Sequence, residues 1–404
     1  MTDGNRDGPH PAIVLGLTGG IAAYKSAELI RRLTSADIGV QVVMTQAATR
    51  FISPMTLQAL SGQPVFTDLW DDRIGNGMAH IDLSRTARLI AVAPASADFL
   101  ARLALGLADD LLSTLCLARD CPLLVAPAMN RQMWEQPATQ RNVERLRSDG
   151  VQVIGPDAGA QACGETGMGR MLEADAIAQS IVAALAPKLL AGQRVLVTAG
   201  PTFERIDAVR GITNSSSGRM GYSVAAAAAE AGARVTLVSG PVSLLIPPGI
   251  ADLVQVVSAQ EMFEAVEAAL PACDIFIAVA AVADYTPRAP HEQKIKKSDA
   301  AMTIELVPTR DILAHVASRP NAPFCVGFAA ESENLEAFAE AKRRRKGVPL
   351  LAANLAQTTI GAESSELLLL DDNGQYRLPQ APKITQARHL IAHLARLLAA
   401  RART

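Results

Sequence analysis

Short apolar runs alternate with helical patterns along the first half of the chain. Four runs without alternating polar residues predict buried strands, at residues 12–17, 40–44, 89–93 and 123–126. Helices are predicted between or after them, over residues 21–33, 97–105, 111–118 and 138–147. Continuous Val, Ile and Leu runs suit a parallel sheet that helices cover on both faces. The pattern therefore predicts a doubly wound α/β fold.

The same pattern starts again near residue 192. Further strands are predicted at 195–198, 234–238, 275–279, 324–327, 349–352 and 367–370, and helices at 219–231 and 384–401. Asn373-Gly374 favours a type I′ turn, which predicts a hairpin at this point. A helix over 175–185 precedes a seam at 187–192. We therefore predict two Rossmann-like α/β domains, residues 1–190 and 191–404.

Composition and charge exclude several classes of protein. The chain has 38 basic and 40 acidic residues, a net charge of -2, so it lacks the basic surplus of a nucleic-acid-binding protein. Hydrophobic residues make up 49% of the sequence, which excludes wholesale disorder. No charge-free apolar stretch is long enough to predict a membrane span. Five cysteines without a Cys-x-x-Cys pair fit a reducing compartment, and we expect a cytoplasmic protein.

Each predicted domain opens with a strand that runs into a glycine-containing turn. These turns are LGLTGG at 15–20 and VTAG at 197–200. Neither matches G-x-G-x-x-G, so the usual dinucleotide fingerprint is absent from both. Such a turn can bind phosphate through the N–H groups of the following helix, or it can be a tight turn with no ligand.

Four polar residues of the first half are candidates for chemistry. Cys163 stands among three glycines in the polar stretch 161–171, where core packing gives no reason for a cysteine. We interpret this stretch as a loop that closes over a site. Asn130 follows the strand 123–126, at the strand end where open α/β sheets bind ligands. His80 is one of six histidines, and a lone histidine is more often structural. Ser96 could contact a ligand or cap a helix.

Several motifs occur in the order and spacing of one known family. They are TGGIAAYK at 18–25, MT at 44–45 with FI at 51–52, HIDL at 80–83, APASAD at 93–98, PAMN at 127–130 and ACG at 162–164. The first half resembles the homo-oligomeric flavin-containing cysteine decarboxylases, and the second half resembles the phosphopantothenate–cysteine ligases. Together they resemble the bacterial bifunctional family of coenzyme A biosynthesis, over all but the N-terminal segment. This resemblance implies a flavodoxin-like decarboxylase domain followed by a doubly wound ligase domain.

For the first domain the resemblance implies flavin chemistry. FMN would oxidise the substrate thiol to a thioaldehyde, which can accept the electrons released with CO₂, and would later return the hydride. His80 would act as general base, Asn130 would hold the substrate carboxylate, and Cys163 would donate a proton to the enethiol intermediate. The implied FMN contacts are Gly19, Gly20, Thr45, Ala93, Pro94, Ala95 and Ser96.

Polar clusters of the second half suit bound anions. NSSSG at 214–218 precedes an alanine-rich helix, and it is either an anion cradle or a simple helix cap. Asp284 follows a predicted strand, and Lys294, Lys296 and Lys297 lie in a polar loop. The run KRRRK at 342–346 is either a solvated helix end or a set of phosphate contacts.

For the second domain the resemblance implies a CTP-dependent ligase. CTP would activate the carboxylate of 4′-phosphopantothenate as an acyl-cytidylate, which the amine of L-cysteine then attacks. Arg210 and Asn214 would hold the acyl-cytidylate, and Mg²⁺, whose ligands stay undefined, would neutralise phosphate charge. The implied nucleotide contacts are Ala280, Asp284, Lys294, Arg310, Asp311, Ile312, Phe328, Lys342 and Lys346. The chain departs from the family at Phe203, where Arg is common, at Ser215, where His is frequent, and at Arg219, where Lys is frequent.

Small molecules are the expected partners: 4′-phosphopantothenate, L-cysteine, CTP and phosphopantothenoylcysteine. Neither a nucleic acid nor a membrane is expected. The resemblance implies a homo-oligomer of decarboxylase trimers and ligase dimers, up to a dodecamer, with decarboxylase sites between subunits. Two alternatives are a nicotinamide-dependent Rossmann reductase and a non-catalytic flavin-binding regulatory protein. The missing fingerprint disfavours the first, and the joint presence of His80, Asn130 and Cys163 disfavours the second.

Overall fold

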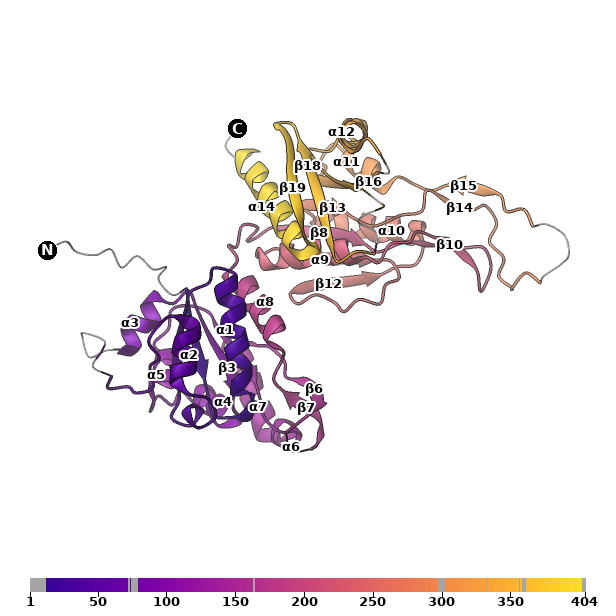
Figure 1. Ribbon diagram of the computed structural model, residues 1–404. Coiled ribbons are helices and arrows are strands. Elements are labelled where there is room, and N and C mark those ends of the chain that lie inside the picture. Colours follow the sequence, from indigo (N-terminus) through magenta and orange to yellow (C-terminus); the bar gives the residue numbers. More distant parts are fainter. Residues whose placement is uncertain are drawn as a thin grey trace. The chain divides into compact units, whose positions relative to one another are not determined.

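A computed structural model describes residues 12–71, 73, 79–162, 164–296, 302–331, 333–355, 357 and 361–401. The chain divides into two compact units, Met1–Ala186 and Pro187–Thr404 (Figure 1). Cys163, Lys297 and the N-terminal segment 1–11 lie outside the described residues.

The first unit is built on a five-stranded parallel sheet in the order β2-β1-β3-β4-β5. Its strands are β1 (Ile13–Leu17), β2 (Val40–Met44), β3 (Leu89–Ala95), β4 (Leu123–Pro127) and β5 (Gln152–Val153). Ile13 pairs with Val40 on one side and with Leu89 on the other. The chain therefore reverses its direction of winding between β1 and β3, which is where flavodoxin-like sheets bind ligands.

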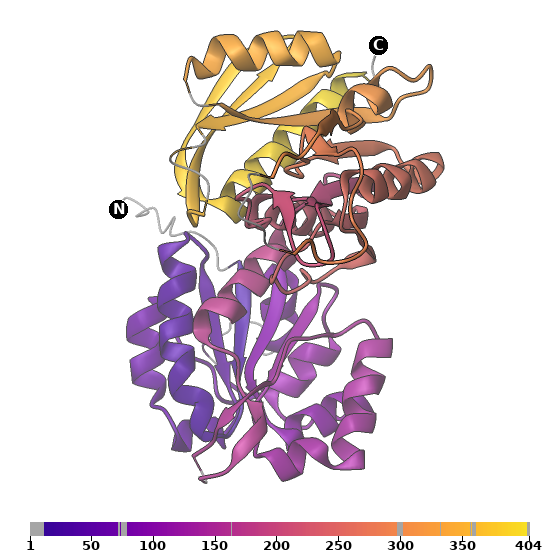
Figure 2. The ribbon, with the colours of Figure 1, turned by 90° about the vertical axis from the view of Figure 1, so that its right-hand side faces the viewer.

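Helices cover both faces of this sheet (Figure 2). One layer contains α1 (Lys25–Ser35), α2 (Pro54–Ser61) and α8 (Ala174–Leu185), and the other contains α3 (Ala79–Thr86), α4 (Ala97–Leu105), α5 (Leu111–Leu117) and α7 (Pro137–Ser148). Successive residues of β1 serve opposite layers: Ile13 and Leu15 pack with the first, and Val14 with the second. Both faces are buried, which explains the unbroken apolar runs.

The second unit contains an eight-stranded sheet in the order β12-β11-β8-β13-β16-β17-β18-β19. Its strands are β8 (Arg194–Ala199), β11 (Arg234–Ser239), β12 (Ile250–Gln255), β13 (Ile275–Ala278), β16 (Phe324–Glu331), β17 (Leu350–Leu355), β18 (Ser364–Asp371) and β19 (Gly374–Pro382). The first six are parallel, and β18 and β19 are antiparallel additions. The parallel part has the Rossmann order and reverses between β8 and β13.

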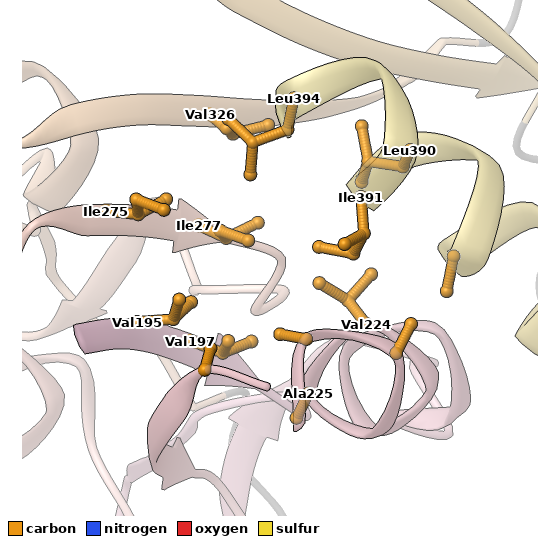
Figure 3. Close-up of a cluster of buried hydrophobic side chains, with 14 of the residues drawn as sticks. Val195, Val197, Val224, Ala225, Ile275, Ile277, Val326, Leu390, Ile391 and Leu394 are labelled. Atoms are coloured by element: carbon orange, nitrogen blue, oxygen red, sulfur yellow. The ribbon is translucent and has the colours of Figure 1, made fainter. Parts of the chain in front are cut away.

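Two different helix layers cover this sheet, as Figure 2 shows for the yellow α14 and the orange α12. One face carries α9 (Arg219–Glu230) and α14 (Lys383–Arg401), and the other carries α10 (Ala259–Ala269), α11 (Ile312–Ala317) and α12 (Leu335–Lys346). Figure 3 shows the first face, where Val197 and Ile277 of the sheet meet Val224 of α9 and Ile391 of α14. The small alanines of α9 allow α14 to pack closely against it.

Short ladders extend from the edges of both sheets. In the first unit, β6 (Asp157–Ala160) and β7 (Thr166–Arg170) form an antiparallel hairpin that lies against α6 (Arg131–Glu135). In the second unit, β9 (Phe203–Arg205) pairs with β10 (Gly211–Thr213), and β14 (Tyr285–Pro287) pairs with β15 (Leu306–Pro308) in the arm at the right of Figure 1.

The predicted fold class is confirmed, with two local corrections. The β18–β19 hairpin turns at Asn373-Gly374 as predicted, and the buried Asp371 carboxylate accepts from both of their N–H groups, at 2.7 and 3.0 Å. Residues 166–170 of the stretch interpreted as a loop form strand β7. His80 lies in helix α3, which the pattern did not predict. No helix within the described ranges combines the length and apolar character needed to cross a bilayer.

Candidate active sites

Three turns meet at the carboxyl ends of β1, β2 and β3. Thr18 links two of them, since its Oγ1 donates to the Pro94 carbonyl at 2.8 Å and accepts from the Ser96 N–H at 2.9 Å. The Thr45 N–H donates to the Leu17 carbonyl at 3.0 Å. These bonds fix the residues predicted to contact FMN into one continuous rim at the reversal of the sheet.

The two glycines of the first turn have different surroundings. A Cβ on Gly19 would come within 2.7 Å of the Ala47 Cβ, so the absence of a side chain lets two turns touch. A Cβ on Gly20 would meet nothing within 4 Å, and Gly20 lines a cavity. Gly19 is therefore needed for packing, whereas Gly20 leaves space open beside the rim.

This cavity has a volume of about 320 Å³ and is the candidate substrate site of the first unit. Its walls come from the turn after β1, the turn after β4 and the β6–β7 hairpin. The residues that line it are Gly20, Ile21, Ala22, Tyr24, Lys25, Ala128, Met129, Asn130, Ala160, Gln161, Ala162, Gly169, Arg170 and Met171. The structure thus brings together Gly20, Asn130 and Ala162, the neighbour of Cys163, from three predicted motifs.

Hydrogen bonds hold the hairpin against the turn that carries Asn130. The Met129 N–H donates to the Gly169 carbonyl at 2.9 Å, and a Cβ on Gly169 would lie 2.4 Å from the Met129 carbonyl oxygen. Gln161 accepts from the Arg131 N–H at 3.0 Å and donates to the Met168 carbonyl at 3.1 Å. Sequence reasoning missed Gln161, because its partner lies 30 residues away.

Asn130 is the N-cap of α6, and its amide has two separate tasks. Its Oδ1 accepts from the Met133 N–H at 3.0 Å, so the oxygen end is used by the helix. Its Nδ2 donates to the exposed Gln132 side chain at 2.8 Å. The Nδ2 group is therefore the part of the Asn130 amide that can donate a hydrogen bond to a carboxylate in the cavity.

His80 does not line this cavity. Helix α3 packs on α5 and β1, and Figure 1 shows it well away from α6 and the β6–β7 hairpin. Lys25, which the sequence reasoning also missed, does line it. Its Nζ donates to the Met171 carbonyl at 3.1 Å and pairs with Glu173 at 2.9 Å.

Burial makes the other described cysteines poor proton donors. It raises the pKa of Cys116 and of Cys325 to about 12, and that of Cys273 to about 11. Both Cys116 and Cys325 are small buried core residues, and Cys273 is partly buried. Cys163 lies outside the described residues.

The second unit has its candidate site where β8 and β13 separate. The Ala280 N–H lies 3.4 Å from Thr198 Oγ1, and the Ala281 N–H donates to the Gly200 carbonyl at 2.9 Å. Asn214 donates through Nδ2 to the Ala281 carbonyl at 2.9 Å. Asn214 is therefore anchored beside Ala280 at the reversal point of this sheet.

Arg210 is held by a buried carboxylate. Asp207 accepts from Arg210 Nε at 2.9 Å and from the N–H groups of Val209 and Ile295, at 2.8 and 3.1 Å. The Arg210 guanidinium, with these N–H groups, holds the pKa of Asp207 well below its usual range. Arg210 also donates to the Ile295 carbonyl at 3.0 Å, which brings the segment of Lys294 to the same place.

The two lysines predicted to bind nucleotide lie on one face of α12 and have different partners. Lys342 is 3.9 Å from Glu331, and Lys346 pairs with Asp311. Burial lowers the pKa of Lys346, and Asp284 opposes that shift, so Asp284 lies nearby. Arg343, between them in sequence, is buried and pairs with Glu340 and Asp372, so the charge run is more than a solvated helix end.

The remaining predicted nucleotide contacts lie on both faces of the sheet. Phe328, in the middle of β16, is partly buried and packs against the α9–α14 core. Asp311 caps α11 by accepting from the Ala314 N–H at 3.0 Å, and Ile312 begins that helix. The Arg310 guanidinium lies over the Phe263 ring, 4.8 Å from its centre. The Arg310 side chain is therefore engaged by this ring contact.

Two of the three departures from the resembling family have structural partners. The Phe203 ring covers Gly211, where a Cβ would lie 2.4 Å from the ring. Arg219 pairs with Glu363 at 3.1 Å. Nothing in the structure explains Ser215. Among the described residues, no group of three or more His, Cys, Asp or Glu side chains is placed to hold a metal ion.

Comparisons with known proteins show which family the chain belongs to. Residues 2–186 match the family described as Flavoprotein, and residues 190–398 match the DNA/pantothenate metabolism flavoprotein C-terminal domain. The coenzyme A biosynthesis bifunctional protein CoaBC of Vibrio cholerae is 49% identical over 92% of this chain and 94% of its own length. CoaBC of Escherichia coli K12 is 48% identical over 91% and 92%. A crystal structure of an FMN-dependent cysteine decarboxylase, SpaF, is 33% identical, covers 44% of this chain and 98% of its own, and has a TM-score of 0.39.

Fold and sites define a two-unit α/β enzyme whose first unit is a flavoprotein. The chain belongs to the family of bifunctional coenzyme A biosynthesis proteins. This membership confirms the predicted pairing of a decarboxylase with a ligase in coenzyme A biosynthesis. The nicotinamide reductase and the non-catalytic regulatory protein are thereby disfavoured.

Proposed function

We propose that the second unit joins 4′-phosphopantothenate to L-cysteine with CTP, and that the first unit decarboxylates the product in the cavity beside Asn130. The observation that carries the proposal is that predicted site residues from separate motifs lie together at the reversal point of each sheet. Gly20, Asn130 and Ala162 share one cavity, and Asn214 is bonded beside Ala280. Each reversal is the place where such a sheet binds its ligand.

The rim of the first unit fits a flavin. Backbone turns after β1, β2 and β3 face the reversal point, Gly20 leaves open space there, and the Ser96 hydroxyl supplies a polar contact. Gly19, Gly20, Thr45 and the turn of Ala93, Pro94, Ala95 and Ser96 would hold FMN. The chemistry supplied by FMN bound there would be reversible hydride transfer with the substrate.

The chain's own residues then bind the substrate and move protons. Asn130 donates through Nδ2 to the substrate carboxylate, because α6 already uses its oxygen. The cavity is mostly apolar beside the rim, which favours loss of a carboxylate charge as CO₂. Cys163 protonates the enethiol intermediate, and His80 removes the thiol proton of the substrate.

His80 requires a second copy of the chain in this proposal, because it does not line the cavity of its own unit. Large apolar side chains support such assembly: Trp70 and Met55 are 81% and 74% exposed, and Phe51, Leu105 and Leu117 are also exposed. Apolar side chains mark protein interfaces where they gather in one contiguous patch. We propose a homo-oligomer in which trimers complete the decarboxylase sites and ligase units pair as dimers. The cytoplasmic location stays a prediction.

In the ligase unit, the charged groups at the reversal hold the nucleotide and the activated acid. Lys342, Lys346 and Lys294 meet the phosphates of CTP, Phe328 lines the base pocket, and Arg210 and Asn214 hold the acyl-cytidylate carbonyl. Mg²⁺ commonly binds one or two carboxylates together with substrate phosphates. Asp284, beside Lys346, is the proposed carboxylate.

Two variants test the assignment of one reaction to each unit. Cys163→Ser should reduce decarboxylation by about 10²-fold or more while ligation is unchanged, and Lys294→Ala should do the reverse. Pyrophosphate release measures ligation, and CO₂ release from supplied phosphopantothenoylcysteine measures decarboxylation. Wild-type protein should show a flavin absorption spectrum. Loss of both activities in either variant would contradict the division.

A further inference from the structure

The segment 289–296 carries Lys294 and lies between β14 and β15, in the arm at the right of Figure 1. It forms neither helix nor strand, and all of its residues are described. Three hydrogen bonds join it to the rest of the unit, and each of them runs to the turn 206–210 between β9 and β10. One is donated by the His291 N–H to the first carbonyl of this turn, at 2.9 Å, and the other two belong to Ile295. The place of Lys294 is therefore set by this turn.

The Asp207 carboxylate divides its two oxygens between the turn and this segment. Its Oδ1 accepts from the N–H groups of Val209 and Arg210, both at 2.8 Å, and so closes the turn. Its Oδ2 accepts from Arg210 Nε at 2.9 Å and from the Ile295 N–H at 3.1 Å. Arg210 in turn donates to the Ile295 carbonyl at 3.0 Å. One carboxylate oxygen therefore joins Arg210 to the neighbour of Lys294.

Burial makes this carboxylate a fixed point of the unit. The Asp207 side chain is fully buried, whereas the Arg210 side chain is 43% exposed. The Arg210 guanidinium, with the three N–H groups, holds the pKa of Asp207 well below its usual range, so the carboxylate is charged at neutral pH. A buried carboxylate with this many donors is held in one geometry, and Arg210 still has surface to offer to a ligand. Asp207 itself cannot touch a substrate.

We propose that Asp207 is a positioning residue for ligation, which fixes Arg210 and Lys294 relative to each other. This inference rests on the proposed function, in which Arg210 holds the acyl-cytidylate and Lys294 meets the phosphates of CTP. In the first step an oxygen of the acid bonds to the α-phosphorus of CTP, and the bond from that phosphorus to pyrophosphate breaks. The acid and the nucleotide must therefore be held in line with each other. Asp207 and Ile295 are 88 residues apart in sequence, so this alignment depends on the bridge between their segments.

Asp207→Asn separates the turn from the bridge. An amide has one acceptor oxygen and one NH₂ group, so one of the two sets of donors loses its acceptor. Asparagine favours such turns through its oxygen, which leaves the NH₂ group facing Arg210 and the Ile295 N–H, and the bridge opens. The kcat for ligation by the full-length enzyme should fall about 10²-fold, measured as pyrophosphate release. The KM values for CTP and 4′-phosphopantothenate should each change less than about fivefold, because alignment is lost rather than binding.

Asp274→Asn is the matched control in the same unit. Asp274 holds Arg194 in a similar way, since it accepts from Arg194 Nη2 at 2.7 Å, from Nε at 3.0 Å and from the N–H at 2.8 Å. Arg194 begins β8 and Asp274 precedes β13, so this pair lies at the edge of the sheet opposite the site. The control should lower the melting temperature, as Asp207→Asn does, and should keep the kcat for ligation within about twofold of wild type.

Hydrogen exchange tests the bridge without turnover. The Ile295 amide should exchange about tenfold faster in Asp207→Asn than in wild type, and at the wild-type rate in Asp274→Asn. Ile295→Pro removes the same N–H from the other side of the bridge and leaves the turn intact. It should lower the kcat for ligation in the same way, and it serves if Asp207→Asn fails to fold.

Three results would overturn the proposal: an unchanged kcat in the bridge variants, an equal loss of kcat in Asp274→Asn, or unchanged exchange at Ile295 in Asp207→Asn. A rise in the KM for CTP alone would also overturn it, because Asp207 would then serve nucleotide binding only. If wild type does not release pyrophosphate from CTP with 4′-phosphopantothenate present, the proposed function itself fails, even where the exchange result confirms the bridge.

Discussion

The two units place their candidate sites at the same point of two parallel sheets and surround it with different chemistry. In the first unit the rim consists of Thr18, two glycines and backbone groups, joined by neutral hydrogen bonds. In the second unit the same place holds Arg210 on the buried Asp207, and Lys346 between Asp311 and Asp284. Sheet order sets where a ligand binds, and the residues of the turns decide which ligand. A neutral rim suits transfer of an electron pair, and a charged one suits phosphate.

The largest expected effect tests whether the first site is shared between copies while the second is not. His80→Asn and Cys163→Ser should each lower decarboxylase kcat by about 10²- to 10⁴-fold, the usual range for a lost acid or base. If His80 serves a neighbouring copy, co-expressed mixtures of the two variants will recover part of the activity. Mixed oligomers that stay as inactive as either variant alone would place both residues in one copy. Ligation should be unchanged throughout, because it uses the other unit.

A smaller effect should separate the two lysines of α12. Lys346→Met should raise the KM for CTP about tenfold, the loss of roughly 1.4 kcal/mol of binding. Because burial lowers the pKa of Lys346, its charge is lost at a lower pH than that of an ordinary lysine. CTP binding by wild type should therefore weaken at a lower pH than an ordinary lysine would give, and Lys346→Arg should move that weakening to higher pH. A pH profile identical in wild type and Lys346→Arg would show that another group titrates.

The smallest effect compares two matched helix caps. Ser96 accepts from the Phe99 N–H at 3.2 Å, and Ser258 of the second unit accepts from the Glu261 N–H at 3.2 Å. Substitution of either by Ala should cost about 1 kcal/mol of stability, and substitution by Gly only a few tenths. Ser96→Gly should also weaken FMN binding about fivefold, a typical neutral hydrogen bond, and Ser258→Gly should not. Equal FMN affinities in a fluorescence titration would make Ser96 a cap and nothing more.

Much of the fold could be predicted because both sheets are buried on both faces. Apolar runs then mark strands directly, and the strand at Val40–Met44 and the helix at Ala97–Leu105 begin and end where expected. The β6–β7 hairpin could not be predicted. At Gly167 and Gly169 the hairpin passes close to Arg131 and Met129. The local sequence contains no signal for such contacts with a distant segment.

The site residues that could be predicted differ from those that could not in the same way: the first depend on local sequence and the second on contacts with distant segments. Asn130 could be placed because it follows a strand, and strand ends define the ligand edge of an α/β sheet. Gln161 and Lys25 could not, since the first takes its meaning from Arg131 and the second from Met171 and Glu173. Long-range neighbours of this kind are decided by the tertiary structure alone.

One consequence follows from the way α6 begins. A carboxamide has an acceptor oxygen and a donor NH₂ group. Because the first turn of α6 uses the oxygen of Asn130, the NH₂ group is the part that can meet an incoming molecule. Aspartate would begin the helix equally well but would confront a carboxylate with a like charge. Serine would begin it too, but it keeps only one O–H donor on a shorter side chain. Other N-cap residues could therefore replace Asn130 for folding but not for binding a carboxylate, and the helix keeps its amide in the required orientation.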